Sequence, residues 1–257
     1  MRTRRPKRKP VAELHAGIYS RLRADRANRD ETKVREISSL DWPLSLPAFG
    51  LDRARVSGYT VHGFEAYARC LIPLETDNES YVRWSAVAAA LGISLSPLTS
   101  WDDLKIAGRS SGVSVPRMQR GTVDSRTIER LIAGLGQGLT SSKQTYFALW
   151  DGYAAEVDGT LAQKSALIPI AEGNYLQDGS FRLFKADLTW VRERSAERGV
   201  RFPVAMWAED GTFVWASALY QDSWYVSCGR AILDSMRGAG LDCLDIDRKD
   251  LLPSMGD

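Results

Sequence analysis

The chain has little histidine and little cysteine. It holds 257 residues but only two histidines, His15 and His62, and three cysteines, Cys70, Cys228 and Cys243, with no Cys-x-x-Cys pair. Histidine is the usual general acid or base near neutral pH and the commonest metal ligand, and zinc sites are built mainly from histidine and cysteine. The sequence therefore predicts no metal site, and each histidine is interpreted as a surface or hydrogen-bonded residue.

A long apolar run is also missing. No stretch approaches the roughly 18 apolar residues that indicate a transmembrane helix. The basic start resembles that of a secretory signal, but charged residues stand where the apolar part of such a signal follows. Those charged residues are Glu13, Arg21, Arg23 and Asp25. The three cysteines are widely spaced in apolar surroundings, which is typical of reduced, buried thiols. We therefore expect a cytoplasmic protein.

The usual sequence motifs of catalysis and phosphate binding are not present either. There is no G-x-x-x-x-G-K-[ST] loop, no G-x-G-x-x-G after a predicted strand and no G-x-S-x-G elbow. Gly134, Gly136 and Gly138 lie late in an amphipathic pattern and are interpreted as the end of a helix. No nucleotide or other cofactor is predicted, and nothing supports a Ser-His-Asp triad.

Basic residues are concentrated at the N-terminus. Of the 34 basic and 32 acidic residues, residues 1–40 hold 12 basic and 5 acidic, a net charge of +7, so the other 217 residues carry −5. The first ten residues contain Arg2, Arg4, Arg5, Lys7, Arg8 and Lys9. Such a segment cannot bury apolar surface, and we expect a disordered tail over 1–10. It is either a solubilising extension or an arm that binds the phosphates of nucleic acid or a ribosome.

Four segments are expected along the chain. The tail is followed by a helical segment over 11–40, where apolar residues recur at helical spacing. Pro43 and Pro47 mark an extended boundary. Beyond it we predict two α+β halves, 41–140 and 141–257. In the first half the pattern predicts one or two strands over 58–73 and a short helix after Ser80.

Residues 93–122 are rich in Pro, Gly and Ser and are predicted to be a long loop. Loops of that length are often functional, so this segment is a place to look for a site. A helix over 123–139 and a buried strand over 145–150 follow. Two more strands, over 165–170 and 181–184, precede a predicted helix over 187–198.

Residues 202–247 have the clearest pattern in the chain. Short aromatic and β-branched runs are separated by Asp210-Gly211, a strong hairpin signal, and by 221–223. From Gly229 the apolar spacing becomes helical, and a last strand alternates with aspartates. The segment predicts a β-β-β-α-β unit, and the whole chain an α+β fold with mainly antiparallel sheets packed with helices.

The chain resembles a family of soluble actinobacterial proteins with a tryptophan-rich N-terminal half and a C-terminal strand-strand-helix unit. The motifs that carry the resemblance are Trp42-Pro43 with Ala48-Phe49-Gly50, Tyr67-Ala68-Arg69, Arg83-Trp84 with Val87-Ala88, Pro97-Leu98 with Trp101, Tyr146-Phe147-Ala148-Leu149-Trp150-Asp151-Gly152, Trp207 with Glu209-Asp210, Ala216-Ser217 and Asp222-Ser223. They cover residues 42–247. The resemblance implies an architecture and no activity.

The chain departs from that family at four positions. Family members often carry histidines where Ile72 and Ser96 stand, and acidic residues where Ala218 and Tyr220 stand. If those side chains form an acid–base or metal site in the family, this chain does not keep it.

Aromatic residues in turns are the best functional signal. Trp and Tyr are enriched at binding hot spots, and the sequence predicts Trp101, Tyr153, Tyr220 and Trp224 in turns. We therefore predict a non-catalytic binding or accessory protein that engages a protein partner, with a basic arm for nucleic acid or ribosome. The alternative is a small hydrolase or transferase whose site forms only in three dimensions.

Overall fold

A computed structural model describes residues 54–78, 80–119, 121–137, 144–150, 166–169, 180–194, 201–217 and 222–253. All belong to the unit Ser45–Asp257, one of the two into which the chain divides. The predicted tail over 1–10 and the helical segment over 11–40 lie outside the described residues. None of the helices in the described part of the chain combines the length and apolar character needed to span a bilayer.

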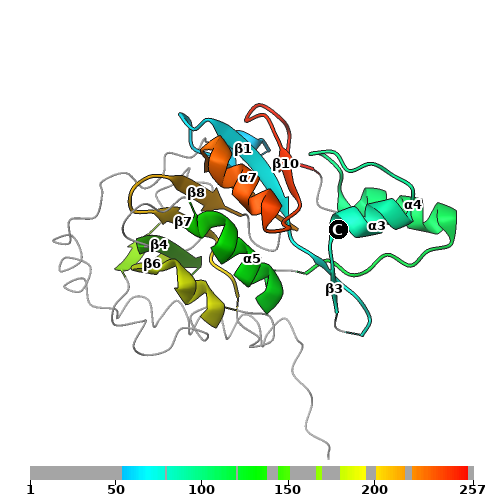
Figure 1. The fold of residues 1–257 in the computed structure, drawn as a ribbon, viewed down its shortest axis with the longest axis horizontal. Coiled ribbons are helices and arrows are strands. Elements are labelled where there is room, and N and C mark those ends of the chain that lie inside the picture. Colours follow the sequence, from blue (N-terminus) through cyan, green and yellow to red (C-terminus); the bar gives the residue numbers. More distant parts are fainter. Residues whose placement is uncertain are drawn as a thin grey trace, which may run out of the picture. The chain divides into compact units, whose positions relative to one another are not determined.

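One large sheet dominates the described residues (Figure 1). Its strand order is β10-β1-β9-β8-β7-β4-β6-β5, and all neighbouring strands are antiparallel. The strands are β1 (Ala66–Leu71), β4 (Gln144–Trp150), β5 (Ala166–Pro169), β6 (Ser180–Asp187), β7 (Ala205–Ala208), β8 (Phe213–Ala216), β9 (Ser223–Cys228) and β10 (Cys243–Asp245). The α+β prediction is confirmed, and β7, β8, β9, α7 (Arg230–Gly238) and β10 form the predicted C-terminal unit.

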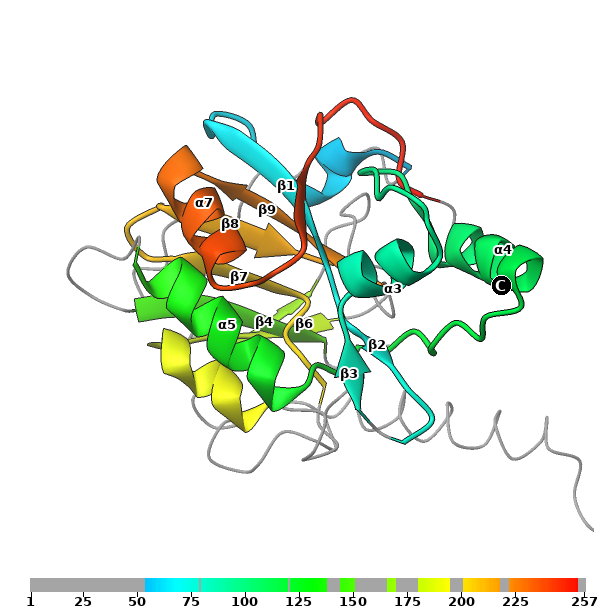
Figure 2. The same cartoon turned by 45° about the vertical axis from the view of Figure 1, so that its right-hand side comes forward.

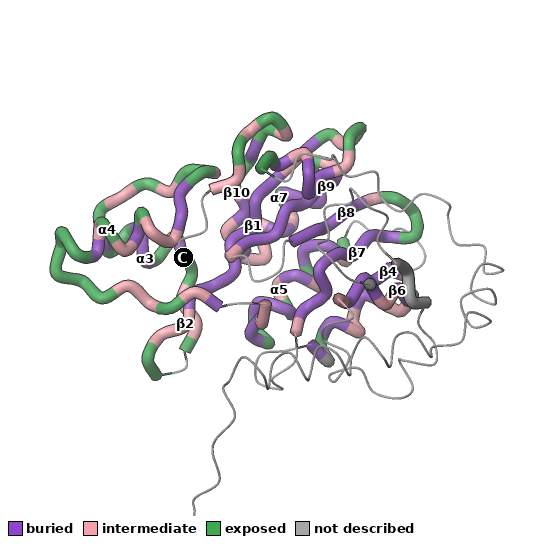
Figure 3. The backbone as a smooth tube through the Cα atoms, turned by 180° about the vertical axis from the view of Figure 1, so that it is seen from behind, coloured by how far each residue is buried: buried purple, intermediate pink, exposed green. Residues whose placement is uncertain are grey.

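The sheet draws on both predicted halves of the chain. β1 comes from the first half and lies between β9 and β10 from the second. Strands β7, β8 and β9 are buried along their whole length (Figure 3). This explains their nearly continuous apolar sequence, because a strand covered on both faces cannot alternate polar residues outward.

Helices cover one face of the sheet (Figure 2). α5 (Ser125–Gly136) and α7 lie side by side on it, with the 3-10 helix η3 (Leu188–Glu193) next to α5. Asp124 caps α5 by accepting a hydrogen bond from the Thr127 amide. Between the helices and the sheet lies an aromatic core in which the rings of Trp215 and Trp224 are 4.4 Å apart.

The predicted helix over 187–198 is a shorter 3-10 helix in the described residues. The Asp187 carboxylate accepts from the amide and hydroxyl of Thr189, two residues on. Such a local turn competes with α-helical hydrogen bonding. Trp190 then packs against Phe147 and Phe184, with ring centroids 5.0 and 4.6 Å away.

Residues 72–119 form a small unit between β1 and α5, which we call the lobe. It contains β2 (Leu74–Glu75), β3 (Tyr81–Val82), α3 (Trp84–Ala90) and α4 (Trp101–Ser111). Its apolar core combines Leu71, at the end of β1, with Leu74, Trp84, Val87, Ala88, Leu91 and Leu104 of the lobe. The indole nitrogen of Trp84 donates to the Ile72 carbonyl at 2.8 Å, which satisfies its buried polar atom.

The prediction of a long loop over 93–122 is wrong, because α4 occupies its middle. Ser100 and Asp103 form a capping box at its start, and Gly112 ends it in the left-handed conformation, φ 66°. The spacing of apolar residues did not indicate this helix, because Leu104 is its only fully buried apolar side chain and Ile106 points to solvent.

Candidate functional site

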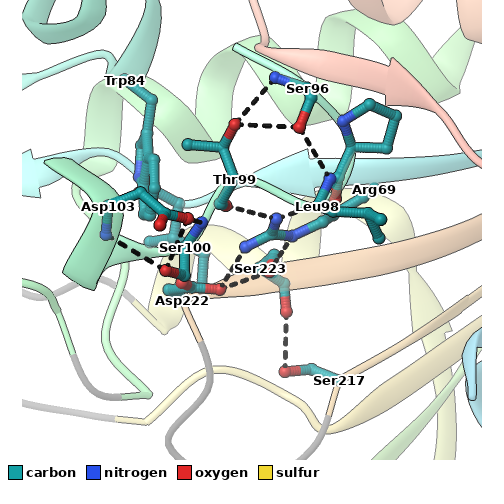
Figure 4. Close-up of polar contacts among 12 residues, drawn as sticks. Arg69, Trp84, Ser96, Leu98, Thr99, Ser100, Asp103, Ser217, Asp222 and Ser223 are labelled. Atoms are coloured by element: carbon teal, nitrogen blue, oxygen red, sulfur yellow. Dashed lines mark hydrogen bonds and ion pairs between the residues drawn. The ribbon is translucent and has the colours of Figure 1, made fainter. Parts of the chain in front are cut away.

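A buried arginine joins the lobe to the sheet (Figure 4). Arg69 in β1 is 0% exposed. Its Nε donates to Ser223 Oγ at 2.8 Å, and its Nη2 donates to Asp222 Oδ1 at 3.0 Å. Its Nη1 donates to the carbonyls of Pro97 and Thr99 at 2.9 and 2.7 Å. A buried charge is tolerated only when it is paired and hydrogen-bonded, and Arg69 meets both conditions.

The strand register explains why Arg69 meets Ser223. In β1, Ala66, Ala68 and Cys70 belong to the core under the helices, so Arg69 points to the opposite face. On β9, Ser223 is the register partner of Leu71, which lies two residues after Arg69 on the same face of β1. Ser223 is therefore the diagonal neighbour of Arg69. The guanidinium also lies 5.9 Å from the Trp84 ring, a cation–π contact from the lobe.

The serines around Arg69 are held by hydrogen bonds and have no histidine next to them in the part of the chain that the structure describes. Ser223 donates its hydroxyl proton to Asp222, and Ser217 Oγ donates to the Ser223 carbonyl at 3.2 Å. Activation of a serine commonly needs a histidine within hydrogen-bond reach. The one histidine in the described residues, His62, lines a different pocket. The cluster therefore neutralises and fixes its own groups and presents no nucleophile.

What Arg69 fixes is a turn at the surface of the lobe. Ser96 and Thr99 close this turn, with the Ser96 amide donating to Thr99 Oγ1 at 2.8 Å and the Thr99 amide to the Ser96 carbonyl at 3.1 Å. With the carbonyls of Pro97 and Thr99 both directed at Arg69, Leu98 stands at the outside of the turn and is 49% exposed. An apolar side chain is thus presented on a backbone that hydrogen bonds hold rigid.

Trp101 follows this turn directly and is also held. It is the first residue of α4, and its indole nitrogen donates to the Pro116 carbonyl at 3.0 Å. Lys105 Nζ lies 4.0 Å from the ring centroid. The ring is partly exposed, and Trp101 lies at the start of a helix next to the turn, whereas the sequence pattern predicts it within a turn.

The other predicted site residues are either buried or outside the described residues. Trp224 was predicted in a turn, and that is wrong: it lies inside β9, 2% exposed, with its ring against Trp215 and Phe202. The turn residues in the sequence end at Ser223, one residue before Trp224, and the Trp224 indole belongs to the core. Tyr153, Tyr220 and the six basic residues of the tail lie outside the described residues.

The sequence pattern did not predict that Leu98 is exposed at the surface. It also did not predict that Arg69 holds the backbone on either side of Leu98. The signal for Arg69 was a charged residue among apolar ones in the strands predicted over 58–73, since arginine is almost never fully buried unless paired. Among the described residues four large apolar side chains are exposed, and three of them, Leu98, Ile106 and Val113, lie on the lobe.

A pocket away from this turn has more basic than acidic residues in its lining. This pocket of about 560 Å³ is lined by Arg55, Ser57, His62, Tyr67, Ile246, Asp247, Arg248 and Lys249. Arg248 donates to Thr60 Oγ1 at 3.1 Å and lies 5.7 Å from the Tyr67 ring centroid. Arg55, Arg248 and Lys249 outnumber Asp247, the one carboxylate among the described lining residues, and this excess of positive charge suits an anion.

The C-terminal aspartates serve the fold. Asp242 accepts from the amide and hydroxyl of Ser85 at 3.0 and 2.8 Å, which ties β10 to α3. Asp245 accepts from Arg230 and Arg237, both at 2.6 Å. Within the described ranges no three His, Cys, Asp or Glu side chains gather as metal ligands would.

Comparison with protein families, with curated proteins and with solved structures finds no match to this chain. The resemblance carried by the sequence motifs therefore stays a prediction, and function has to be argued from the side chains themselves.

Proposed function

We propose that this protein is a non-catalytic binding protein that engages a protein partner through the turn and helix start at Leu98 and Trp101. The observation that carries the proposal is the fixation of this turn by Arg69, which leaves Leu98 exposed on a rigid backbone. Binding gains most from apolar and aromatic anchors that are ordered beforehand, because little conformational entropy is lost on association.

The described residues favour binding over the hydrolase or transferase alternative. Ser223 has no histidine beside it among the described residues, and the carboxylate that accepts its proton, Asp222, is paired to Arg69. Burial raises the pKa of the Cys228 thiol to about 12 and that of Cys70 well above its ordinary value. Since the thiolate is the nucleophile, neither cysteine is activated as a catalytic nucleophile near neutral pH.

Partner capture with point variants tests the proposal. Immobilised protein is exposed to lysate of its own host, and retained proteins are quantified. Leu98→Asp and Trp101→Ala each should reduce retention of the specific partner at least about tenfold, as expected for hot-spot residues. Leu98 is half exposed and its side chain makes no hydrogen bond, so Leu98→Asp should keep the far-ultraviolet spectrum and melting temperature of the parent. Trp101→Ala removes the indole hydrogen bond to the Pro116 carbonyl, so its retention is compared only after its far-ultraviolet spectrum shows that the chain is folded.

The matched control is Ile106→Asp. Ile106 is 61% exposed on the same helix, but it follows the buried Leu104 by two residues and therefore faces away from it. Retention should stay at the parental level in this variant. Equal retention by all variants, or equal loss from Ile106→Asp and Leu98→Asp, would count against the assigned surface.

A further inference from the structure

Two of the three cysteines face each other across neighbouring strands. Cys70 in β1 is the register partner of Cys243 in β10, and their sulfur atoms are 2.7 Å apart. Both thiols are buried under the helices, with Cys70 1% and Cys243 6% exposed. All three cysteines are free and buried, as expected, and two of them are also in contact with each other.

The backbone pairing at this position suits a covalent link. The Leu71 amide donates to the Asp242 carbonyl at 2.9 Å, and the Ile246 amide to the Tyr67 carbonyl at 3.1 Å. Leu71 with Asp242 and Tyr67 with Ile246 are thus hydrogen-bonded pairs of the ladder, and such pairs occur at every second position. Cys70 and Cys243 lie between two of these positions and form a non-hydrogen-bonded pair. In such pairs the Cα atoms are about 4.5 Å apart and the side chains approach closely. Disulfides span Cα separations of about 4.4–6.8 Å.

We propose that Cys70 and Cys243 are a disulfide site, at which oxidation links the edge strand β10 covalently to β1. Register, shared face and sulfur proximity are all satisfied without movement of the backbone. The link would close a chain segment that contains the lobe, α5 and most of the sheet. It would also fix β10, which has three residues and a strand neighbour on one side only.

The oxidant we assign is a small-molecule disulfide of the glutathione class. The thiolate of Cys243, at the start of the edge strand, attacks one sulfur of oxidised glutathione and releases one glutathione thiolate. The sulfur of Cys70, after loss of its proton, attacks Cys243 Sγ and expels the second glutathione. Two cysteine thiols are thereby oxidised by two electrons, and the two protons pass to the two released glutathione thiolates.

Burial makes the exchange slow in the folded chain. It raises the pKa of Cys70, so little thiolate is present near neutral pH. Opening of β10 exposes Cys243, and the rate of oxidation should follow that opening. Cys228 is the third thiol of the group; it is 0% exposed in β9, opposite Ala66, one strand further from β10.

Thiol counting and peptide mapping test the site. The full chain is equilibrated in oxidised glutathione, quenched, denatured and labelled with a maleimide. The expected product has one labelled cysteine, a mass two hydrogens below the reduced chain and a tryptic link between the Cys70 and Cys243 peptides. Its melting temperature should lie about 5–10 °C above that of the reduced chain. The reaction should reverse in dithiothreitol.

Three variants separate this pair from the other combinations. Cys228→Ala should still form the link, whereas Cys70→Ala and Cys243→Ala should each keep two free thiols. Mapping of the parent chain does not depend on how the variants fold. Three labelled cysteines at equilibrium in the parent, a link that involves Cys228, or intermolecular dimers in place of the internal link would overturn the proposal.

Discussion

At the scale of single residues, Arg69 holds the greatest concentration of polar contacts in the described interior. Its guanidinium makes four hydrogen bonds to two side chains and two carbonyls, and one of those side chains carries the neutralising charge. A protein with a buried ion pair is often no more stable than a variant in which apolar residues replace both partners. Removal of one partner is costly, because the other charge then remains buried alone.

We therefore expect Arg69→Met to reduce the free energy of unfolding by about 3–5 kcal/mol. The loss reflects the stranded Asp222 carboxylate and the unpaired carbonyls of Pro97 and Thr99. Urea denaturation followed by tryptophan fluorescence measures it. Arg230→Met is the control: Arg230 also pairs with an aspartate, but at the exposed surface, so its loss should stay below about 1 kcal/mol.

The double variant of Arg69→Met and Asp222→Asn gives a further check. With no lone charge left, it should lose less than the sum of the two single variants. A loss for Arg69→Met as small as that of the Arg230 control would show that the lobe does not depend on this pair.

At the scale of helices and strands, the contact between α5 and α7 depends on one glycine. A Cβ built on Gly134 would lie 2.7 Å from the Met236 Cα, which is backbone and cannot turn away. The two helix axes therefore approach closely at this point, and Leu131, Leu135 and Leu233 around it are fully buried. This packing places both helices on the sheet face that contains Cys70 and Cys243.

Gly134→Ala should destabilise the protein by about 1–3 kcal/mol, the usual cost of overpacking. The melting temperature should fall by about 2–4 °C for each kcal/mol. Gly136→Ala provides a matched control two residues further along the same helix, because nothing lies within 4 Å of the added Cβ. The control should be neutral or more stable by up to about 1 kcal/mol, since alanine is the better helix former. Opposite signs in the two variants are the expected result.

At the scale of the whole molecule, the charge is divided between the N-terminal segment and the rest of the chain. Residues 1–40 carry +7 and the remaining 217 residues carry −5. We propose that the tail over 1–10 is a polyanion-binding arm, because six basic residues in ten can neutralise several phosphates. The basic pocket at Arg55, Arg248 and Lys249 is a second place where an anion could bind.

Deletion of residues 1–10 should therefore lower the salt concentration at which the protein elutes from heparin and leave the melting temperature unchanged. Its affinity for a DNA or RNA oligonucleotide should also depend less steeply on salt, since fewer counterions are released. Lys249→Ala in the full chain tests the pocket separately. Unchanged elution of the deletion variant would contradict the role of the tail, and a shift in Lys249→Ala alone would place polyanion contact at the pocket.

The sequence by itself determined the elements whose pattern comes from local repetition. The hairpin at Asp210-Gly211, the helix from Arg230 and the capped helix after Asp124 are all confirmed, because turn residues, caps and apolar spacing act within a few positions of each other. The sequence pattern failed over 93–122, where α4 buries one apolar side chain and the helical period is therefore invisible.

Only the tertiary structure decided which distant residues meet. Arg69 and Asp222 are 153 positions apart, and Cys70 and Cys243 are 173 apart. Their pairing depends on β1 lying between β9 and β10, an order that no local pattern specifies. The same order buried Trp224, since burial is set by what packs against a residue after the strands have been arranged.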